Sequence, residues 1–224
     1  MDIFSHFTFP MTVATWVAFL IPTVVSCVSP GPGALSSMAA GLRYGFARGM
    51  LNCLGLQVAI IVNVFIIWLG LGALLMASTL AFDIMKYGGA AYLIWLGIQK
   101  FRETTAAVDV NAASNININD SAFKIFRQGF WVNLTNPKGM VFLLAVLPQF
   151  VDVTRPTAPQ YAVLTATMVG VDMMVMACYT GFAAKVLALL NKPEQIQWTN
   201  RILGGLFVAA GCALMLFRKT ERMA

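Results

Sequence analysis

Apolar residues recur along the chain in runs of membrane-spanning length, separated by short polar or glycine-rich segments. A transmembrane helix needs roughly 20 consecutive, mainly apolar residues. Runs near this length lie at about 11–28, 49–71, 73–99, 126–150, 160–190 and 202–217. The pattern predicts an all-α integral membrane protein with six transmembrane helices.

The longest polar segment divides this pattern into two halves. Residues 103–121 are rich in Asn and Ala and predict a flexible loop. We expect a single transporter domain, residues 1–224, made of repeat 1 (about 11–101), a cytoplasmic loop (about 102–123) and repeat 2 (about 124–218). Halves with an odd number of helices must be inverted relative to each other, and each half carries a cap-plus-proline interruption. Chance similarity between glycine-rich membrane segments is the alternative explanation.

The composition excludes several classes of protein. Hydrophobic residues make up 59% of the chain and charged residues 11%, against about 25% charged in a soluble domain. The net charge of +6 comes from Lys and Arg scattered in short loops, without the basic patch of a nucleic-acid-binding protein. The four cysteines and the single histidine show no metal-binding spacing. We therefore expect no nucleic-acid partner, no metal, no cofactor and no enzymatic activity.

The distribution of positive charge predicts the orientation in the membrane. Loops that face the cytoplasm carry an excess of Lys and Arg. The loops after the first, third and fifth runs carry eight such residues, Arg43, Arg48, Lys100, Arg102, Lys124, Arg127, Lys192 and Arg201. The other side carries four, Arg155, Arg218, Lys219 and Arg222. The excess of eight basic residues over four predicts that both termini lie outside the cytoplasm. The positive charge of the C-terminal tail favours the opposite orientation.

The fourth apolar run is interrupted near its middle by Asn136-Pro137-Lys138. Proline removes a backbone donor and clashes with the carbonyl four residues earlier, here that of Asn133. Asn followed by Pro is also typical of a helix start, with Asn as N-cap. We predict two half-helices that meet inside the bilayer. A lysine at that depth costs about 2.5–3.5 kcal/mol on insertion scales and usually marks function.

A second interruption, Ser29-Pro30-Gly31-Pro32-Gly33, follows the first apolar run. Its prolines leave the carbonyls of Ser26 and Val28 without their usual helical donors. Free carbonyls accept from an ammonium group, whereas the amides at a helix start suit a carboxylate. Two such breaks facing each other would bind a zwitterion. Taken alone, the proline-glycine segment would be an ordinary turn.

Two acidic residues fall inside apolar runs. Asp172 lies near the middle of the fifth run, with Tyr179 seven residues later on the same helix face. A buried carboxylate needs a cation, and Lys138 is the expected partner. The pair is either a static link between helices or part of a transport site in which Asp172 exchanges protons. Asp83 is a second candidate for proton coupling, although its neighbour Lys86 could simply neutralise it.

Polar side chains in apolar runs complete the set of candidates. Asn52, Gln57, Asn63 and Asn133 each need a hydrogen-bond partner, and contacts between helices are the default role for all four. Asn133, which lies in the VNLTNPK segment, is also a candidate for substrate binding.

Several motifs, in this order, resemble the lysine exporter (LysE/RhtB) family. They are SPGPG at 29–33, the glycine-punctuated segment 41–49, GGAAYLIWLGIQ at 88–99, VNLTNPK at 132–138 and LPQF at 147–150, with Val171-Asp172 and Tyr179 fitting as well. The likeness covers nearly the whole chain and is greatest to the homoserine/threonine resistance branch. It implies that Pro30, Gly31, Pro32, Asn136, Pro137 and Lys138 are family hallmarks. It also implies a multi-pass protein of the bacterial inner membrane that exports amino acids or close derivatives in exchange for protons.

Together these observations predict a secondary transporter with periplasmic termini that exports a small amino acid or derivative, such as homoserine, homoserine lactone or threonine. The predicted substrate-binding residues are Pro30, Gly31, Pro32, Asn133, Asn136, Pro137, Lys138, Asp172 and Tyr179, and the predicted proton-coupling residues are Asp172 and Asp83. The partners are the substrate, protons and the lipid bilayer. Glycine-rich faces also permit a homo-oligomer. An inorganic-ion permease and a membrane thiol electron carrier are the alternatives.

Overall fold

The computed structural model describes residues 10–77, 79–102, 120–183 and 193–216, and the regular elements among these residues are all helical. In chain order they are α1 (Val13–Val28), α2 (Pro32–Ala77), α3 (Thr79–Arg102), α4 (Ala122–Leu134), α5 (Pro137–Val146), the 3-10 turn η2 (Leu147–Phe150), α6 (Thr157–Gly181) and α8 (Pro193–Leu216). The helical class predicted from the sequence is therefore confirmed.

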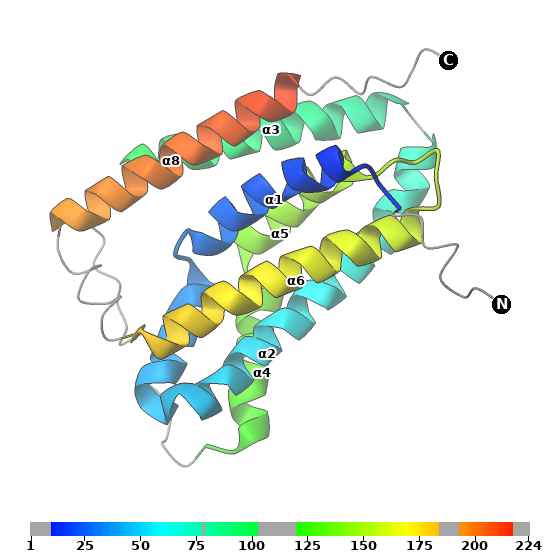
Figure 1. Cartoon of the computed structure of the whole chain (residues 1–224). Helices are drawn as coiled ribbons and strands as arrows, with labels where there is room; N and C mark the ends of the chain where they lie inside the picture. Colours follow the sequence, from blue (N-terminus) through cyan, green and yellow to red (C-terminus); the bar gives the residue numbers. More distant parts are fainter. Residues whose placement is uncertain (1–9, 78, 103–119, 184–192, 217–224) are drawn as a thin grey trace.

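The helices run roughly alongside one another in the view of Figure 1. Helices α3 and α8 lie side by side along one edge, and α2, α4 and α6 pack together on the opposite side. Helices α1 and α5 lie between these groups. The two breaks in the chain, after α1 and after α4, are therefore both in the interior of the bundle.

The described helices support a multi-pass membrane protein. Two stretches, Pro32–Gly70 and Thr157–Gly181, are each long and apolar enough to cross a bilayer. Helix α4 and the segment Pro137–Phe150 together make a third span, bent by 54° at the break. The prediction that one apolar run is divided into two half-helices is thus confirmed. The sequence predicts six spans, three more than these helices establish.

Helix α2 differs from the prediction at both ends. We expected a helix from about residue 49 to 71, whereas α2 begins at Pro32 and continues to Ala77. Within it only Gly45 leaves the helical conformation, with φ 74° and ψ 175°. Gly41 remains helical and is needed for close approach, because a Cβ there would lie 2.1 Å from the carbonyl oxygen of Thr180 on α6. Gly45 therefore marks a kink at which two helical stretches join, whereas Gly41 and Gly49 serve in helix packing against α6.

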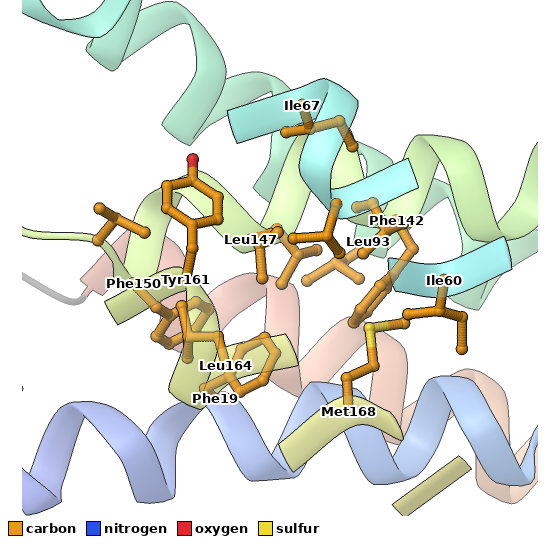
Figure 2. Packing of buried hydrophobic residues seen from close by; sticks show 14 of the residues in the cluster. Phe19, Ile60, Ile67, Leu93, Phe142, Leu147, Phe150, Tyr161, Leu164 and Met168 are labelled. Carbon is orange, nitrogen blue, oxygen red and sulfur yellow. The ribbon is translucent and has the colours of Figure 1, made fainter. Parts of the chain in front are cut away.

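The hydrophobic core joins both halves of the chain (Figure 2). Phe19 of α1 and Phe150 of η2 meet edge to face with ring centroids 5.3 Å apart. Ile60 of α2, Phe142 of α5 and Met168 of α6 belong to the same cluster of buried side chains. In a bilayer such packing acts mainly through van der Waals contact. The core therefore fixes α1, α2, α5 and α6 around the two breaks.

Glycines bring the broken helix α4 against α2. A Cβ on Gly129 of α4 would lie 2.1 Å from the carbonyl oxygen of Asn52, and one on Gly55 of α2 would lie 2.0 Å from that of Phe126. Real Cβ atoms essentially never come so close to backbone. Only glycine allows this crossing, which holds the end of α4 beside the middle of α2.

Candidate functional site

The α4–α5 break is a helix start inside the bundle. Asn136 is the N-cap of α5, and its side-chain oxygen accepts from the backbone N–H of Lys138 at 3.1 Å. Pro137 occupies the first turn, as predicted. Pro137 has no N–H and the Met140 N–H donates to the Asn136 carbonyl at 3.0 Å, so the Gly139 amide is the remaining donor of this turn, at the end of the helix that carries partial positive charge.

The break after α1 supplies carbonyl groups to the same space. Lys138 Nζ donates to the carbonyl oxygens of Ser26 at 3.2 Å and Ser29 at 2.7 Å. The hydroxyl of Tyr179 donates to the carbonyl of Val28 at 2.7 Å. The carbonyls of Ser26 and Val28 were expected to lack helical donors. Both are held instead by side chains from the second half of the chain.

Asp172 lies on α6, facing the same region. Gln57 Nε2 of α2 donates to its Oδ2 at 2.7 Å, and Cys27 of α1 lines the same cavity. Lys138 and Asp172 line one cavity and attract each other across it. We expected Lys138 itself to hold the carboxylate. Its ammonium is directed to the α1 carbonyls instead, and the neutral amide of Gln57 supplies the hydrogen bond to Asp172.

A cavity of about 60 Å³ separates these groups, enough for a few water molecules. It is lined by Ser26, Cys27, Ser29, Gly31, Gly33, Ala34, Leu56, Ile60, Asn63, Asn133, Asn136, Lys138, Gly139, Leu143, Met168, Asp172 and Met176. Both breaks and both charges therefore border one cavity.

Five of the predicted substrate-binding residues line this cavity, namely Gly31, Asn133, Asn136, Lys138 and Asp172. Gly31 is in close contact with Lys138, since a Cβ on it would lie 3.3 Å from Lys138 Cδ. Pro30, Pro32, Pro137 and Tyr179 are outside the lining and shape the breaks or hold their backbone. Asp83 falls within α3, and its side chain lies outside the described residues.

The sequence analysis did not single out several residues of the site. Cys27 was considered only as a metal ligand and set aside, and Gln57 and Asn63 were expected to link helices. Met168 and Met176 flank Asp172 at one helical turn on either side and line the same wall. The spacing of polar residues within apolar runs was the available signal for Gln57 and Asn63, but the sequence does not reveal which helix each one faces.

The arrangement places charges of opposite sign around one small space. The start of α5 and Lys138 favour an anion, and Asp172 favours a cation. A small zwitterion matches this pattern, because its carboxylate can face the start of α5 and Lys138 while its ammonium group faces Asp172. Among the described residues no three His, Cys, Asp or Glu side chains gather to hold a metal ion, and the four cysteines are unpaired.

Comparisons with known proteins agree with this geometry. The family model of the LysE type translocator matches residues 24–218. A homoserine/homoserine lactone efflux protein of Salmonella typhimurium is 37% identical over 204 residues, which cover 91% of this chain and 97% of that protein. An uncharacterized membrane protein of Vibrio cholerae is 37% identical over 206 residues, covering 92% and 98%. A leucine efflux protein of Enterobacter is 28% identical over 187 residues, covering 83% and 87%.

No solved structure shows a significant match to the chain. The family match extends from the end of α1 to the region beyond α8 and includes both breaks and Asp172. The relatives that carry a functional name are efflux proteins for amino acids or their derivatives. The chain is therefore a transporter and not an enzyme, and it belongs to the LysE type translocator family.

Proposed function

We propose that this chain exports small neutral amino acids and their derivatives, with homoserine, homoserine lactone and threonine as the leading substrates, across the bacterial inner membrane. One observation carries the proposal. One cavity is bordered by the α5 N-terminus, by Lys138 and by Asp172. The names of the relatives that cover nearly the whole chain support homoserine and its lactone.

In the amino-acid substrates, the carboxylate binds at the start of α5 and to Lys138, and the ammonium binds to Asp172. Homoserine lactone has no free carboxylate and would present its ester carbonyl to the same helix start. Lys138 already donates to the carbonyls of Ser26 and Ser29. When its ammonium group turns to the substrate carboxylate, those two carbonyls lose their donor. They then become available to the substrate ammonium, so the protein exchanges one cation for another at the α1 break.

Proton entry drives export through Asp172. Protonation from the outer side removes the negative charge that holds the substrate ammonium, and this favours release. Gln57 and Cys27 would stabilise the ionised carboxylate of Asp172 when no substrate is bound. Asp83, on α3, is a second candidate for the proton pathway.

Six spans in two inverted repeats would accommodate this chemistry. Repeat 1 (about 11–101) contains α1, α2 and α3, and repeat 2 (about 124–218) contains the broken α4–α5 span, α6 and α8. Contacts between α3 and α8 support a two-fold relation because they are reciprocal. A Cβ on Gly97 would lie 2.6 Å from the carbonyl oxygen of Gly204, and a Cβ on Gly204 would lie 2.8 Å from that of Gly97.

In this arrangement residues 1–224 form one transporter domain in the lipid bilayer, with periplasmic termini and the connection at about 102–123 in the cytoplasm. The two breaks act as hinges for alternating access. A homo-oligomer is compatible with the many large apolar side chains exposed on the outer helix faces.

The test is amino-acid efflux from cells or proteoliposomes that carry Asp172→Asn or Lys138→Met. Each variant should lower proton-driven homoserine efflux at least about tenfold, because hydrogen bonds to charged groups contribute roughly 1.5–3 kcal/mol. Asp152→Asn and Lys124→Met are matched controls outside the cavity and should leave efflux near wild type. Wild-type efflux in both cavity variants would refute the site assignment.

A further inference from the structure

Asn63 of α2 is a buried amide without a described hydrogen-bond partner. Its side chain is 3% exposed, and its Oδ1 accepts no hydrogen bond from any described residue. The other polar side chains that interrupt the apolar runs are different. Asn52 accepts from Ser36, Gln57 donates to Asp172, and Asn133 donates to the carbonyl of Leu56. Asn52 Nδ2 and Gln57 Oε1 are also buried without a partner, but each of these three side chains makes at least one hydrogen bond, whereas Asn63 makes none with a described residue.

The position of Asn63 connects it to the transport cavity. It lies on the same α2 face as Leu56 and Ile60, and all three line the cavity wall. Six residues separate Asn63 from Gln57, the residue that holds Asp172, which is about 9 Å along the helix axis. The amide therefore borders the part of the cavity that Leu56 and Ile60 line.

The other walls of that part are apolar. Leu143 of α5 and Met168 of α6 are both almost fully buried, and Ile60 packs with Met168 in the same cluster (Figure 2). An unpaired polar atom in such surroundings carries a free-energy penalty that a ligand hydroxyl would remove. The wall thus combines three apolar side chains with one amide that lacks a partner.

We propose that Asn63 recognises the side-chain hydroxyl of the transported amino acid. The inference rests on the proposed function, because Lys138, Asp172 and the α5 start must first hold the carboxylate and ammonium groups. The substrate side chain then extends between Leu143 and Met168 toward Asn63. Its hydroxyl donates to Oδ1, and an amino acid of the same size without a hydroxyl leaves that oxygen unpaired.

Among the proposed substrates this selects the short, hydroxyl-bearing amino acids homoserine and threonine, because the side-chain oxygen of homoserine lactone is esterified and cannot donate. Homoserine and norvaline form the sharpest pair for a test, because they differ only by a hydroxyl in place of a methyl group. Sites built around a hydrogen bond to a substrate discriminate strongly against analogues that cannot make it. The wild-type protein should therefore export homoserine at least about tenfold faster than norvaline at equal concentration.

Asn63→Leu tests the role of the amide because it keeps a similar volume and removes both polar atoms. The ratio of homoserine to norvaline efflux should fall at least about tenfold, mainly through lower homoserine efflux. Thr165→Val is the matched control, because it removes a hydroxyl from α6 on a face that borders a separate groove with Ile61 and Tyr161. Its ratio should equal that of wild type.

The outcomes separate this inference from the proposed function. If wild type exports neither amino acid, the proposed function fails together with the inference. If wild type exports both at the same rate, the exporter stands and the inference is overturned. An unchanged ratio in Asn63→Leu, including equal loss of both substrates, also overturns it. Purified wild-type protein gives a check that needs no variant, since homoserine should raise Tm more than norvaline does and equal shifts would contradict the inference.

Discussion

The crossing of α2 and α4 holds the broken helix in place, and Gly129→Ala tests it directly. A Cβ at this position would lie 2.1 Å from the carbonyl oxygen of Asn52, whereas ordinary contact begins at 3.4 Å. The helices must separate by about 1.3 Å at the crossing to accept the new methyl group. Overpacking of this kind costs roughly 1–3 kcal/mol.

The separation also affects the next turn of α4. Asn133 Nδ2 donates to the carbonyl of Leu56 at 2.9 Å, and a shift of that size would stretch this bond past hydrogen-bonding range. A lost hydrogen bond adds about 1 kcal/mol. The total of about 2–4 kcal/mol corresponds to a Tm lower by about 4–16 °C for a chain of this length.

The assay is thermal unfolding of the detergent-purified protein, followed by the loss of helical circular dichroism. Gly170→Ala is the matched control, because this glycine also lies inside a helix and a Cβ on it would meet nothing within 4 Å. Its Tm should be equal to or above that of wild type, since alanine favours helix. A Gly129→Ala protein with the wild-type Tm would refute the claim that backbone contact sets this crossing.

Two further predictions concern the residues that organise the cavity. Asn136→Ala removes the N-cap of α5 and should lower Tm by the equivalent of about 0.5–2 kcal/mol. Asn136→Asp keeps an acceptor for the Lys138 amide and should retain most of the stability. Equal Tm values for wild type and both variants would contradict the capping role of Asn136. Gln57→Leu removes the donor to Asp172 and should both lower homoserine efflux and shift its pH dependence, because the carboxylate loses the 2.7 Å bond that favours its ionised form. A loss of efflux with an unchanged pH profile would mean that Gln57 has only a structural role.

The sequence alone determined the helical class and the position of the break between α4 and α5. Proline at 137 cannot donate a backbone hydrogen bond, and asparagine at 136 is a favoured cap, so local chemistry decides where one helix ends and the next begins. The loss of helical donors for Ser26 and Val28 follows in the same way from Pro30 and Pro32. Membrane-spanning segments also follow from apolar composition, because lipid leaves few alternatives to a helix.

The glycines predicted local structure less well than the prolines and Asn136 did. The segment with Gly41, Gly45 and Gly49 suggested a loop, yet only Gly45 leaves the helical conformation. Glycine permits a turn and equally permits close contact between helices, and the neighbouring helix decides which of these uses applies. Gly41 packs against the backbone of α6, which is far away in sequence, so no local pattern could have identified its role.

Only the tertiary structure decided which polar groups meet. The sequence placed Lys138 and Asp172 at similar depth and suggested a direct pair. In the fold the Lys138 ammonium reaches the α1 carbonyls, and Gln57 reaches Asp172. These partners are separated by more than 100 positions. Their contacts depend on the rotation and crossing of whole helices, which the packing of many side chains sets together, whereas caps and breaks depend on a few adjacent residues.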